Sequence, residues 1–386
     1  MGYGMASLRD QFQRFYAPDA GAIAGALRTG LVVPDTNVLL SLYRFQAEAR
    51  DELLGVLERL EDRLWVPYQV ALEFHQNRLN VIAEQERFFG KAREDLDASL
   101  NEYATKLRTF ANRIALGQSA VQELEEGLRK AHAIVTSEVY RAEQANEVHL
   151  DNRDCDGALS RLEVLLSNRV GEPMSPSELD TARKEAQKRF EAKIPPGYKD
   201  RGKPDPSGDY LIWKQFIVEA KKRQVPAILI TDDRKEDWFR REHGLTLGPR
   251  IELCEEMETE AGVPFLLMTS ETFLVQAKEH LRVPVSATTV DQAKKLPESI
   301  EEHDDLMARR SGIQERITES TGRLNDLLAV RSSLERAIRD PPATNLATGQ
   351  LPVQKMGEIN FRISALREEV TALQAVALSL DSENLQ

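Results

Sequence analysis

Short, continuous apolar runs separated by longer stretches of helical periodicity occur in two parts of the chain. The clearest runs are 31–34 (LVVP), 64–66 (LWV), 226–230 (PAILI) and 263–268 (VPFLLM). Runs of this length without alternation are typical of strands that are covered on both faces. Strands that alternate with helices imply an open parallel sheet, because each parallel connection requires a crossover. The pattern therefore predicts an α/β fold.

Between these two parts, the pattern changes to that of long, charged helices. Apolar residues follow a 4-3-4-3-4 spacing, typical of a coiled-coil seam, at Leu96, Leu100, Tyr103, Leu107, Phe110 and Ile114. Two more helical patterns near the end of the chain are separated by a turn region, DPPATNLATGQLP. We interpret both parts as helical hairpins. The predicted segments are the first part of the core (1–84), an inserted coiled-coil hairpin (85–150), the second part of the core (151–283), a linker (284–298) and a C-terminal helical hairpin (299–386).

Composition narrows the class of protein. Hydrophobic residues make up 41% of the 386 residues and charged residues 30%, an ordinary globular balance. The chain has no apolar run of 18 residues, and its first residues lack the apolar region of a signal peptide, so we expect neither a membrane span nor secretion. Cys155 and Cys254 lie far apart without a nearby metal-ligating partner, which favours a reduced, cytoplasmic protein.

The distribution of charge bears on nucleic-acid binding. A net charge of −12 argues against a protein that coats nucleic acid over its whole surface. Between residues 181 and 203, however, eight basic residues stand against three acidic ones. This surplus fits either a contact with a phosphate backbone or an ordinary solvated helix face.

Two of the predicted strands end in acidic residues. Asp35 follows the run 31–34, and Asp232 and Asp233 follow the run 226–230. Ligands of open α/β sheets bind beyond the carboxyl ends of the strands. A single Asp directly after a strand is a helix N-cap about as often as it is a ligand-binding residue. Carboxylates brought together from two strands, however, repel one another unless a cation lies between them. With no His or Cys beside these acids, the hard cations Mg²⁺ or Mn²⁺ are indicated.

Four separated motifs resemble the PIN-like domains of bacterial proteins. They are LVVPDTNVLLSLYRF, VPYQVALEFHQNR, KIPPGYKDRGKPDPSGDYLIWKQF and ILITDDRKEDWF, in the order of that family. The resemblance covers about 28–85 and 190–275. It implies a three-layer α/β/α domain with a central parallel sheet, here extended by long helical-hairpin insertions, and the activity of a metal-dependent nuclease.

The resemblance also implies the residues of the site. The expected catalytic and metal-binding carboxylates are Asp35, Glu73, Asp209 and Asp233, with Asp232 as a further metal ligand. The polar residues expected to hold this cluster in place are Asn37 and Thr231. The basic residues that are candidates to bind substrate phosphates are Arg201, Lys203, Lys214 and Arg234. Asp237 is interpreted either as an outer support or as an exposed acid, and Trp238 as a packing residue.

The implied function is hydrolysis of phosphodiester bonds with Mg²⁺ or Mn²⁺, in RNA rather than DNA, in a toxin-like or phage-defence role. Nucleic acid is the expected partner, and the helical arms suggest a homodimer or a protein partner. A phosphatase of the haloacid dehalogenase type fits less well, because it needs an acid where this chain has Asn37. A receiver-like domain fits poorly in the order of its motifs. The alternative from another class is a catalytically silent scaffold that acts as a coiled-coil adaptor.

Overall fold

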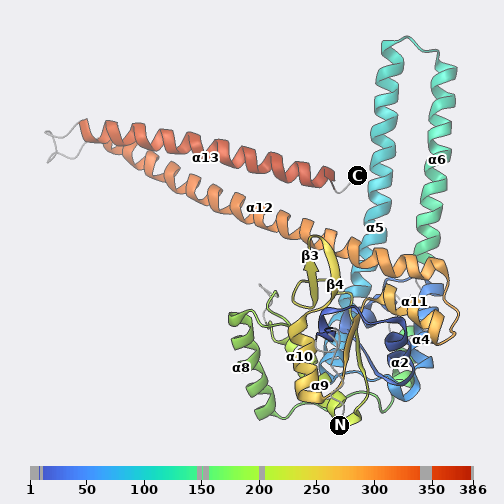
Figure 1. Ribbon diagram of the computed structural model, residues 1–386. Helices are drawn as coiled ribbons and strands as arrows, with labels where there is room; N and C mark the ends of the chain where they lie inside the picture. The colour runs from blue at the N-terminus through green and yellow to red at the C-terminus, as the bar shows by residue number, and fades with distance from the viewer. Residues whose placement is uncertain are drawn as a thin grey trace, which may run out of the picture. The chain divides into compact units, whose positions relative to one another are not determined.

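The computed structural model describes residues 8, 12–145, 150, 156–199, 205–339 and 350–383, and it divides into two compact units, 1–297 and 298–386. Figure 1 shows the elements with their labels. The strands are β1 (Leu31–Pro34), β2 (Ala227–Ile230), β3 (Phe239–Glu242), β4 (Leu245–Pro249) and β5 (Phe265–Met268). The α-helices are α2 (Ala20–Thr29), α3 (Thr36–Leu40), α4 (Ala47–Arg59), α5 (Tyr68–Arg113), α6 (Gln118–Gln144), α7 (Gly157–Leu165), α8 (Pro176–Ala192), α9 (Gly208–Arg223), α10 (Ile251–Ala261), α11 (Ser270–His280), α12 (Ala287–Arg339) and α13 (Gln350–Glu383). Short 3₁₀ helices are η1 (Gln13–Phe15), η2 (Ser41–Tyr43) and η3 (Glu61–Arg63).

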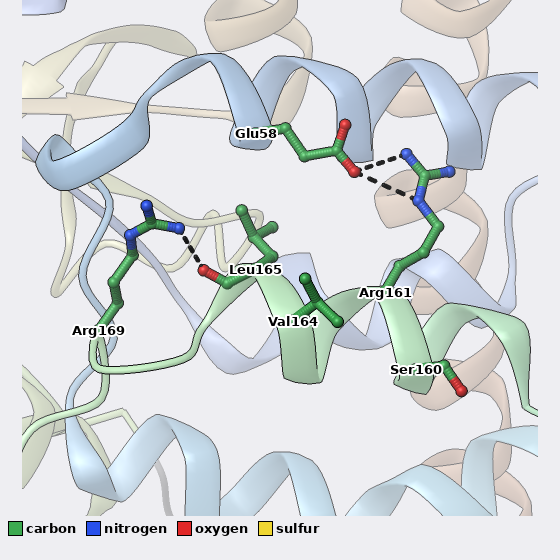
Figure 2. Close-up of a pocket in the computed structure, with 6 residues that line it drawn as sticks. All are labelled: Glu58, Ser160, Arg161, Val164, Leu165 and Arg169. Atoms are coloured by element: carbon green, nitrogen blue, oxygen red, sulfur yellow. Dashed lines mark hydrogen bonds and ion pairs between the residues drawn. The ribbon is translucent and has the colours of Figure 1, made fainter.

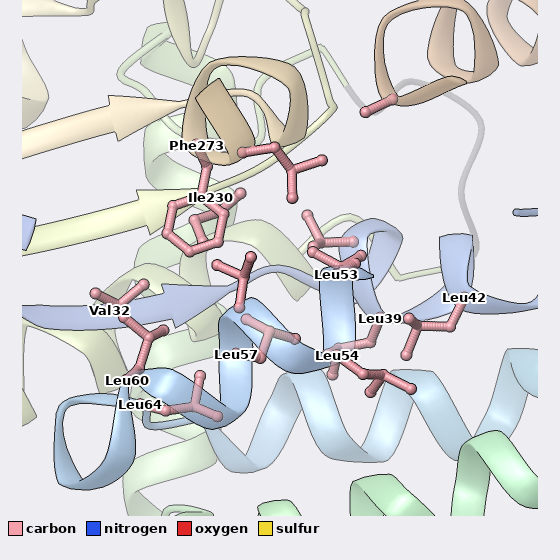
Figure 3. Close-up of a cluster of buried hydrophobic side chains, with 14 of the residues drawn as sticks. Val32, Leu39, Leu42, Leu53, Leu54, Leu57, Leu60, Leu64, Ile230 and Phe273 are labelled. Atoms are coloured by element: carbon pink, nitrogen blue, oxygen red, sulfur yellow. The ribbon is translucent and has the colours of Figure 1, made fainter. Parts of the chain in front are cut away.

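The first unit is built around a parallel three-stranded sheet in the order β1-β2-β5. Side chains alternate between the two faces of the strands, and each face has its own core. Val32, Ile228 and Ile230 pack with residues of α3, α4 and α11 (Figure 3). Leu31 and Val33 pack on the opposite face with residues of α8, α9 and α10. The predicted α/β fold with helices on both sides of a parallel sheet is confirmed.

Two strand elements differ from the expectation. The run 64–66 forms only two isolated bridges, Leu64 with Val32 and Val66 with Val170. Pro67 follows at once; it has no amide hydrogen to extend a ladder, and α5 begins directly after it. The antiparallel pair β3–β4 is not predicted, because most of its side chains are exposed and therefore leave no alternation of apolar and polar residues.

The inserted hairpin is formed by α5 and α6, and α5 begins in the core rather than at residue 85. Leu96, Leu100 and Leu107 of the predicted seam are half-buried, but at the two aromatic positions the inward face is shifted by one residue. Ala111 is buried and Ala104 is half-buried, whereas Tyr103 and Phe110 are 63% and 58% exposed. Alanines let the two helix backbones approach closely, and this displaces the larger aromatic side chains to the outside.

The structure is helical over most of the predicted linker 284–298. Helix α12 begins at Ala287, and Val285, Thr289 and Ala293 are almost completely buried. Ser286 anchors this start, because its amide donates to Glu52 Oε2 (2.8 Å). The stretch looks like a polar linker in the sequence because its buried side chains are small and its other face is polar.

The second unit pairs the later part of α12 with α13 (Figure 1). Ser320 Oγ donates to Glu369 Oε1 (3.3 Å), and Ile363 and Leu373 are buried. Among the residues that the structure describes, no helix is both long enough and apolar enough to span a bilayer.

A buried carboxylate fastens α7 to the start of the long arm. Asp156 Oδ2 accepts from the Tyr43 hydroxyl (2.8 Å) and from Arg78 Nη1, while its Oδ1 accepts from the Leu159 amide at the beginning of α7. Asp156 is 2% exposed. Its loss would leave a largely buried arginine and a buried hydroxyl without their acceptor.

We expect Asp156→Ala to lower the free energy of unfolding by roughly 3 kcal/mol, because one member of a buried ion pair is removed. Urea denaturation followed by circular dichroism measures this change. The matched control is Asp51→Ala, which breaks an exposed pair with Arg161 and should cost less than about 1 kcal/mol. Equal losses for both variants would refute the role given to Asp156.

Candidate metal centre

Asp35 is the central acid at the carboxyl edge of the sheet. It ends β1 and caps α3, where its Oδ1 accepts from the Thr36 amide (2.7 Å). Its Oδ2 accepts from the Thr231 hydroxyl (2.7 Å), at the end of β2, and from Asn37 Nδ2 (2.8 Å). Asn37 Oδ1 in turn accepts from the Asp232 amide (3.0 Å). These bonds join the ends of the neighbouring strands β1 and β2 around one carboxylate.

Glu73 reaches the same place from the second turn of α5. Its Oε2 accepts from the Thr36 hydroxyl (2.8 Å), and its Oε1 accepts from Gln69 Nε2 (2.8 Å). Thr36 therefore contacts both Asp35 and Glu73. The start of α9 also lies against Glu73, since a Cβ added at Gly208 would be 2.7 Å from Glu73 Oε1.

Asp209, directly after Gly208, lies in the first turn of α9. Its Oδ2 accepts from Trp238 Nε1 (3.3 Å), so this buried tryptophan is also a partner of an acid and not only a packing residue. Asp237 is completely buried, and its Oδ2 accepts from the amides of Gly197 and Lys199 (3.1 Å each). Asp237 thus binds the turn at 197–199, and Trp238 binds Asp209; both partners are distant in sequence.

Asp233 and Asp232 turn in different directions after β2. The Asp233 amide donates to the Thr231 hydroxyl oxygen (3.1 Å), and its side chain forms an ion pair with Lys235 (2.8 Å). Both Asp232 oxygens accept from Ser270, one from its amide (2.9 Å) and one from its hydroxyl (2.6 Å). Asp232 therefore fastens the β5–α11 junction, away from the bonds that surround Asp35.

Burial and the charges of neighbouring acids raise the pKa of several of these carboxyl groups. Burial, together with the charges of Glu73 and Asp233, raises the pKa of Asp35 to about 7, although hydrogen bonds from Thr231 and Thr36 act against this. Burial also raises the pKa of Asp237, and the charge of Asp233 adds to that effect. Burial likewise raises the pKa of Asp232, opposed by its bonds from Ser270.

The donor chemistry fits a hard divalent cation, since oxygen is the ligand atom that Mg²⁺ and Mn²⁺ prefer. The buried Asp237 Oδ1 has no hydrogen-bond partner, and Asp35 lies where its negative charge is costly. In the part of the chain that is described, no three His, Cys, Asp or Glu side chains are spaced to hold a metal ion. Each acid is instead bonded to its own neighbours.

Two of the four basic substrate candidates belong to the described residues. Arg201 and Lys203 lie outside the described residues. Lys214 Nζ is 5.9 Å from the centroid of the Tyr210 ring. Arg234 lies between the acidic cluster and α12, and its Nη2 is 3.5 Å from the carbonyl oxygen of Lys294.

A surface pocket lies elsewhere, between α4 and α7 (Figure 2). Arg161 forms an ion pair there with Glu58 (2.8 Å). Its lining residues are Glu58, Ser160, Arg161, Val164, Leu165 and Arg169. None of them belongs to the acidic cluster, so we base no function on this pocket.

Comparison with known families agrees with this architecture. A family model described as a PIN like domain matches residues 31–253, from the start of β1 into α10. The match covers more than half of the chain, and the chain therefore belongs to the PIN-like domain family. Members of this family are generally nucleases. No curated protein and no solved structure matches the chain.

We expect the raised pKa of Asp35 to make stability depend on pH. Burial raises the pKa of this carboxyl from its ordinary value of 3.8 to about 7 in the folded protein, so the folded state retains the proton to higher pH. The free energy of unfolding should fall as pH rises from about 4 to 7, by roughly 1.4 kcal/mol per pH unit. Urea denaturation in EDTA measures this slope. Asp35→Asn cannot ionise and should give a shallower slope; identical slopes would argue against a buried, costly charge.

Proposed function

We propose that this protein is a divalent-metal-dependent nuclease that hydrolyses phosphodiester bonds, preferring RNA to DNA. The observation that supports it is that Asp35, Glu73 and Asp233 are linked through Thr36 and Thr231 at the carboxyl edge of the sheet of a PIN-like domain. Thr36 links Asp35 to Glu73, and Thr231 links Asp35 to Asp233. Gly208, the residue before Asp209, lies against Glu73. Among the hydrogen bonds and ion pairs described above, Lys235 contributes the charged donor of this network, and the other side-chain donors, Thr36, Asn37, Gln69, Thr231 and Trp238, are neutral.

The residues then have distinct roles. Asp35, Asp209 and Asp233 would hold the Mg²⁺ or Mn²⁺, which supplies Lewis-acid activation of water and neutralises charge on the phosphate. Glu73, held by Thr36 and Gln69, would orient the attacking water or hold a second ion. Asn37 and Thr231 keep the Asp35 carboxylate turned toward the cluster, and Asp232 acts through Ser270 and not as a ligand.

The direct test is incubation of the purified protein with labelled single-stranded RNA and DNA of one sequence, in Mg²⁺, Mn²⁺ or EDTA. We expect cleavage with either cation, faster for RNA, and none in EDTA. Asp35→Asn should abolish cleavage, because a neutral amide cannot replace a charged ligand. The control Asp51→Asn changes an exposed acid and should keep activity. The proposal fails if no cation supports cleavage, or if Asp35→Asn cuts as well as the wild type.

A second variant leaves every acid in place. A methyl group added by Gly208→Ala would collide with Glu73 Oε1 at 2.7 Å and push this carboxylate from its position. We expect the cleavage rate to fall by roughly 10- to 100-fold, since small displacements of catalytic groups are costly. Gly90→Ala on the same helix as Glu73 meets no atom within 4 Å and is the matched control. Full activity in Gly208→Ala would contradict the requirement for Glu73 in its present position.

The biological role that we propose is toxin-like RNA cleavage or defence against phage, supported by the combination of a nuclease core with helical arms. Unchanged growth and RNA after induced expression would contradict this role. The second candidate function is a silent coiled-coil adaptor, favoured by the apolar side chains that the arms expose, among them Phe88 and Ile134 at 64% and 66%. An adaptor would keep its cellular function when Asp35 and Asp233 are both replaced by Ala.

A further inference from the structure

Lys235 reaches the acidic cluster from the segment that follows β2. Its Nζ is 2.8 Å from Asp233 Oδ2, and its amide donates to Asp233 Oδ1 (3.1 Å). Both Asp233 oxygens are thus contacted by a residue only two positions away. The Asp233 side chain is 17% exposed and that of Lys235 is 38% exposed, so the carboxylate is mostly enclosed while the lysine borders solvent.

This ion pair engages an acid that the proposed nuclease needs as a metal ligand. An ammonium group and a divalent cation repel each other strongly when both are within contact distance of one carboxylate. Asp35 differs from Asp233, because its carboxylate accepts hydrogen bonds from the neutral donors Thr36, Asn37 and Thr231. A cation at Asp35 therefore meets no positively charged side chain in these bonds, whereas at Asp233 it competes with Lys235.

Lysine is chemically suited to such an exchange. Its charge is compact, its four-carbon stem is flexible, and its ammonium group binds phosphates well. After displacement, the ammonium group stays tethered two residues from Asp233, beside the carboxylates and therefore beside any phosphate that they help to cleave.

We propose that Lys235 is an exchangeable counter-cation of Asp233: a divalent cation displaces its ammonium group, which then binds a phosphate of the nucleic-acid substrate. This inference rests on the proposed nuclease function. It implies an order of binding: the cation binds Asp233 first, and the released ammonium group of Lys235 then binds the phosphate.

The first test measures Mn²⁺ binding by isothermal titration calorimetry, without any nucleic acid. Lys235→Met keeps the stem but removes the competing charge, and should bind Mn²⁺ roughly 2- to 5-fold more tightly than the wild type. Lys235→Arg keeps the charge and should resemble the wild type. The matched control is Lys295→Met, which breaks a 2.8 Å pair with Asp291 on α12 and should change nothing. If Lys235 only stabilised the loop, its loss would weaken Mn²⁺ binding or leave it unchanged, and either result overturns the proposal.

The second test measures binding of a single-stranded RNA oligonucleotide by fluorescence anisotropy, with Glu73→Gln in every protein to prevent cleavage. In Mn²⁺, Lys235→Met should weaken binding, and the slope of log affinity against log salt should fall by roughly 0.7, the loss of one phosphate contact. In EDTA the same substitution should have no effect, because the ammonium group is then engaged by Asp233. An equal loss in both conditions overturns the exchange.

These outcomes separate the two proposals. Failure of the wild-type protein to bind Mn²⁺ at all would refute the metal-dependent nuclease and, with it, the exchange. Mn²⁺ binding that is not strengthened by Lys235→Met would refute the exchange alone. Circular dichroism spectra of all variants establish that each has the wild-type fold.

Discussion

The hydrogen bond from the Thr231 hydroxyl to the Asp35 carboxylate is the constraint on which the site depends. It joins the ends of β1 and β2, two buried strands that pair in parallel. The same hydroxyl accepts from the Asp233 amide, so one small side chain sets the position of two acids that are 198 positions apart in sequence. Because both strands are buried on both faces, the hydrophobic cores on either side hold this bond in place.

The mutual repulsion of the acids is reduced in a different way at each carboxylate. Asp35 is enclosed among neutral donors and retains its proton more strongly. Asp233 is neutralised by Lys235, whereas Glu73 and Asp209 are bonded to Gln69, Thr36 and Trp238. Gathering these carboxylates on one cation therefore requires side-chain bonds to be exchanged, while the backbone around them is already fixed by the sheet. Cation binding at this site would then depend on these neighbouring side chains as well as on the acids.

The sequence predicts what depends on local pattern. The buried strands appear as apolar runs, and the acids that end them follow directly. Residues whose role depends on distant partners are not predicted: Asp237 looks like an ordinary acid until its contacts with Gly197 and Lys199 are known. The register of the α5–α6 seam also depends on which side of α5 its partner occupies, and no heptad pattern specifies that. The sequence shows that Lys235 lies two residues after Asp233, but it does not show that the lysine side chain turns back to this carboxylate.

The continuity of α5 has a mechanical consequence. Glu73 lies near the beginning of this helix, and the same unbroken rod continues to Arg113, about 60 Å further at 1.5 Å per residue. The helix contains no proline and no interruption, so it has none of the usual causes of a kink. A partner bound at the far end of α5 would therefore be connected through one continuous helix to Glu73 of the acidic cluster.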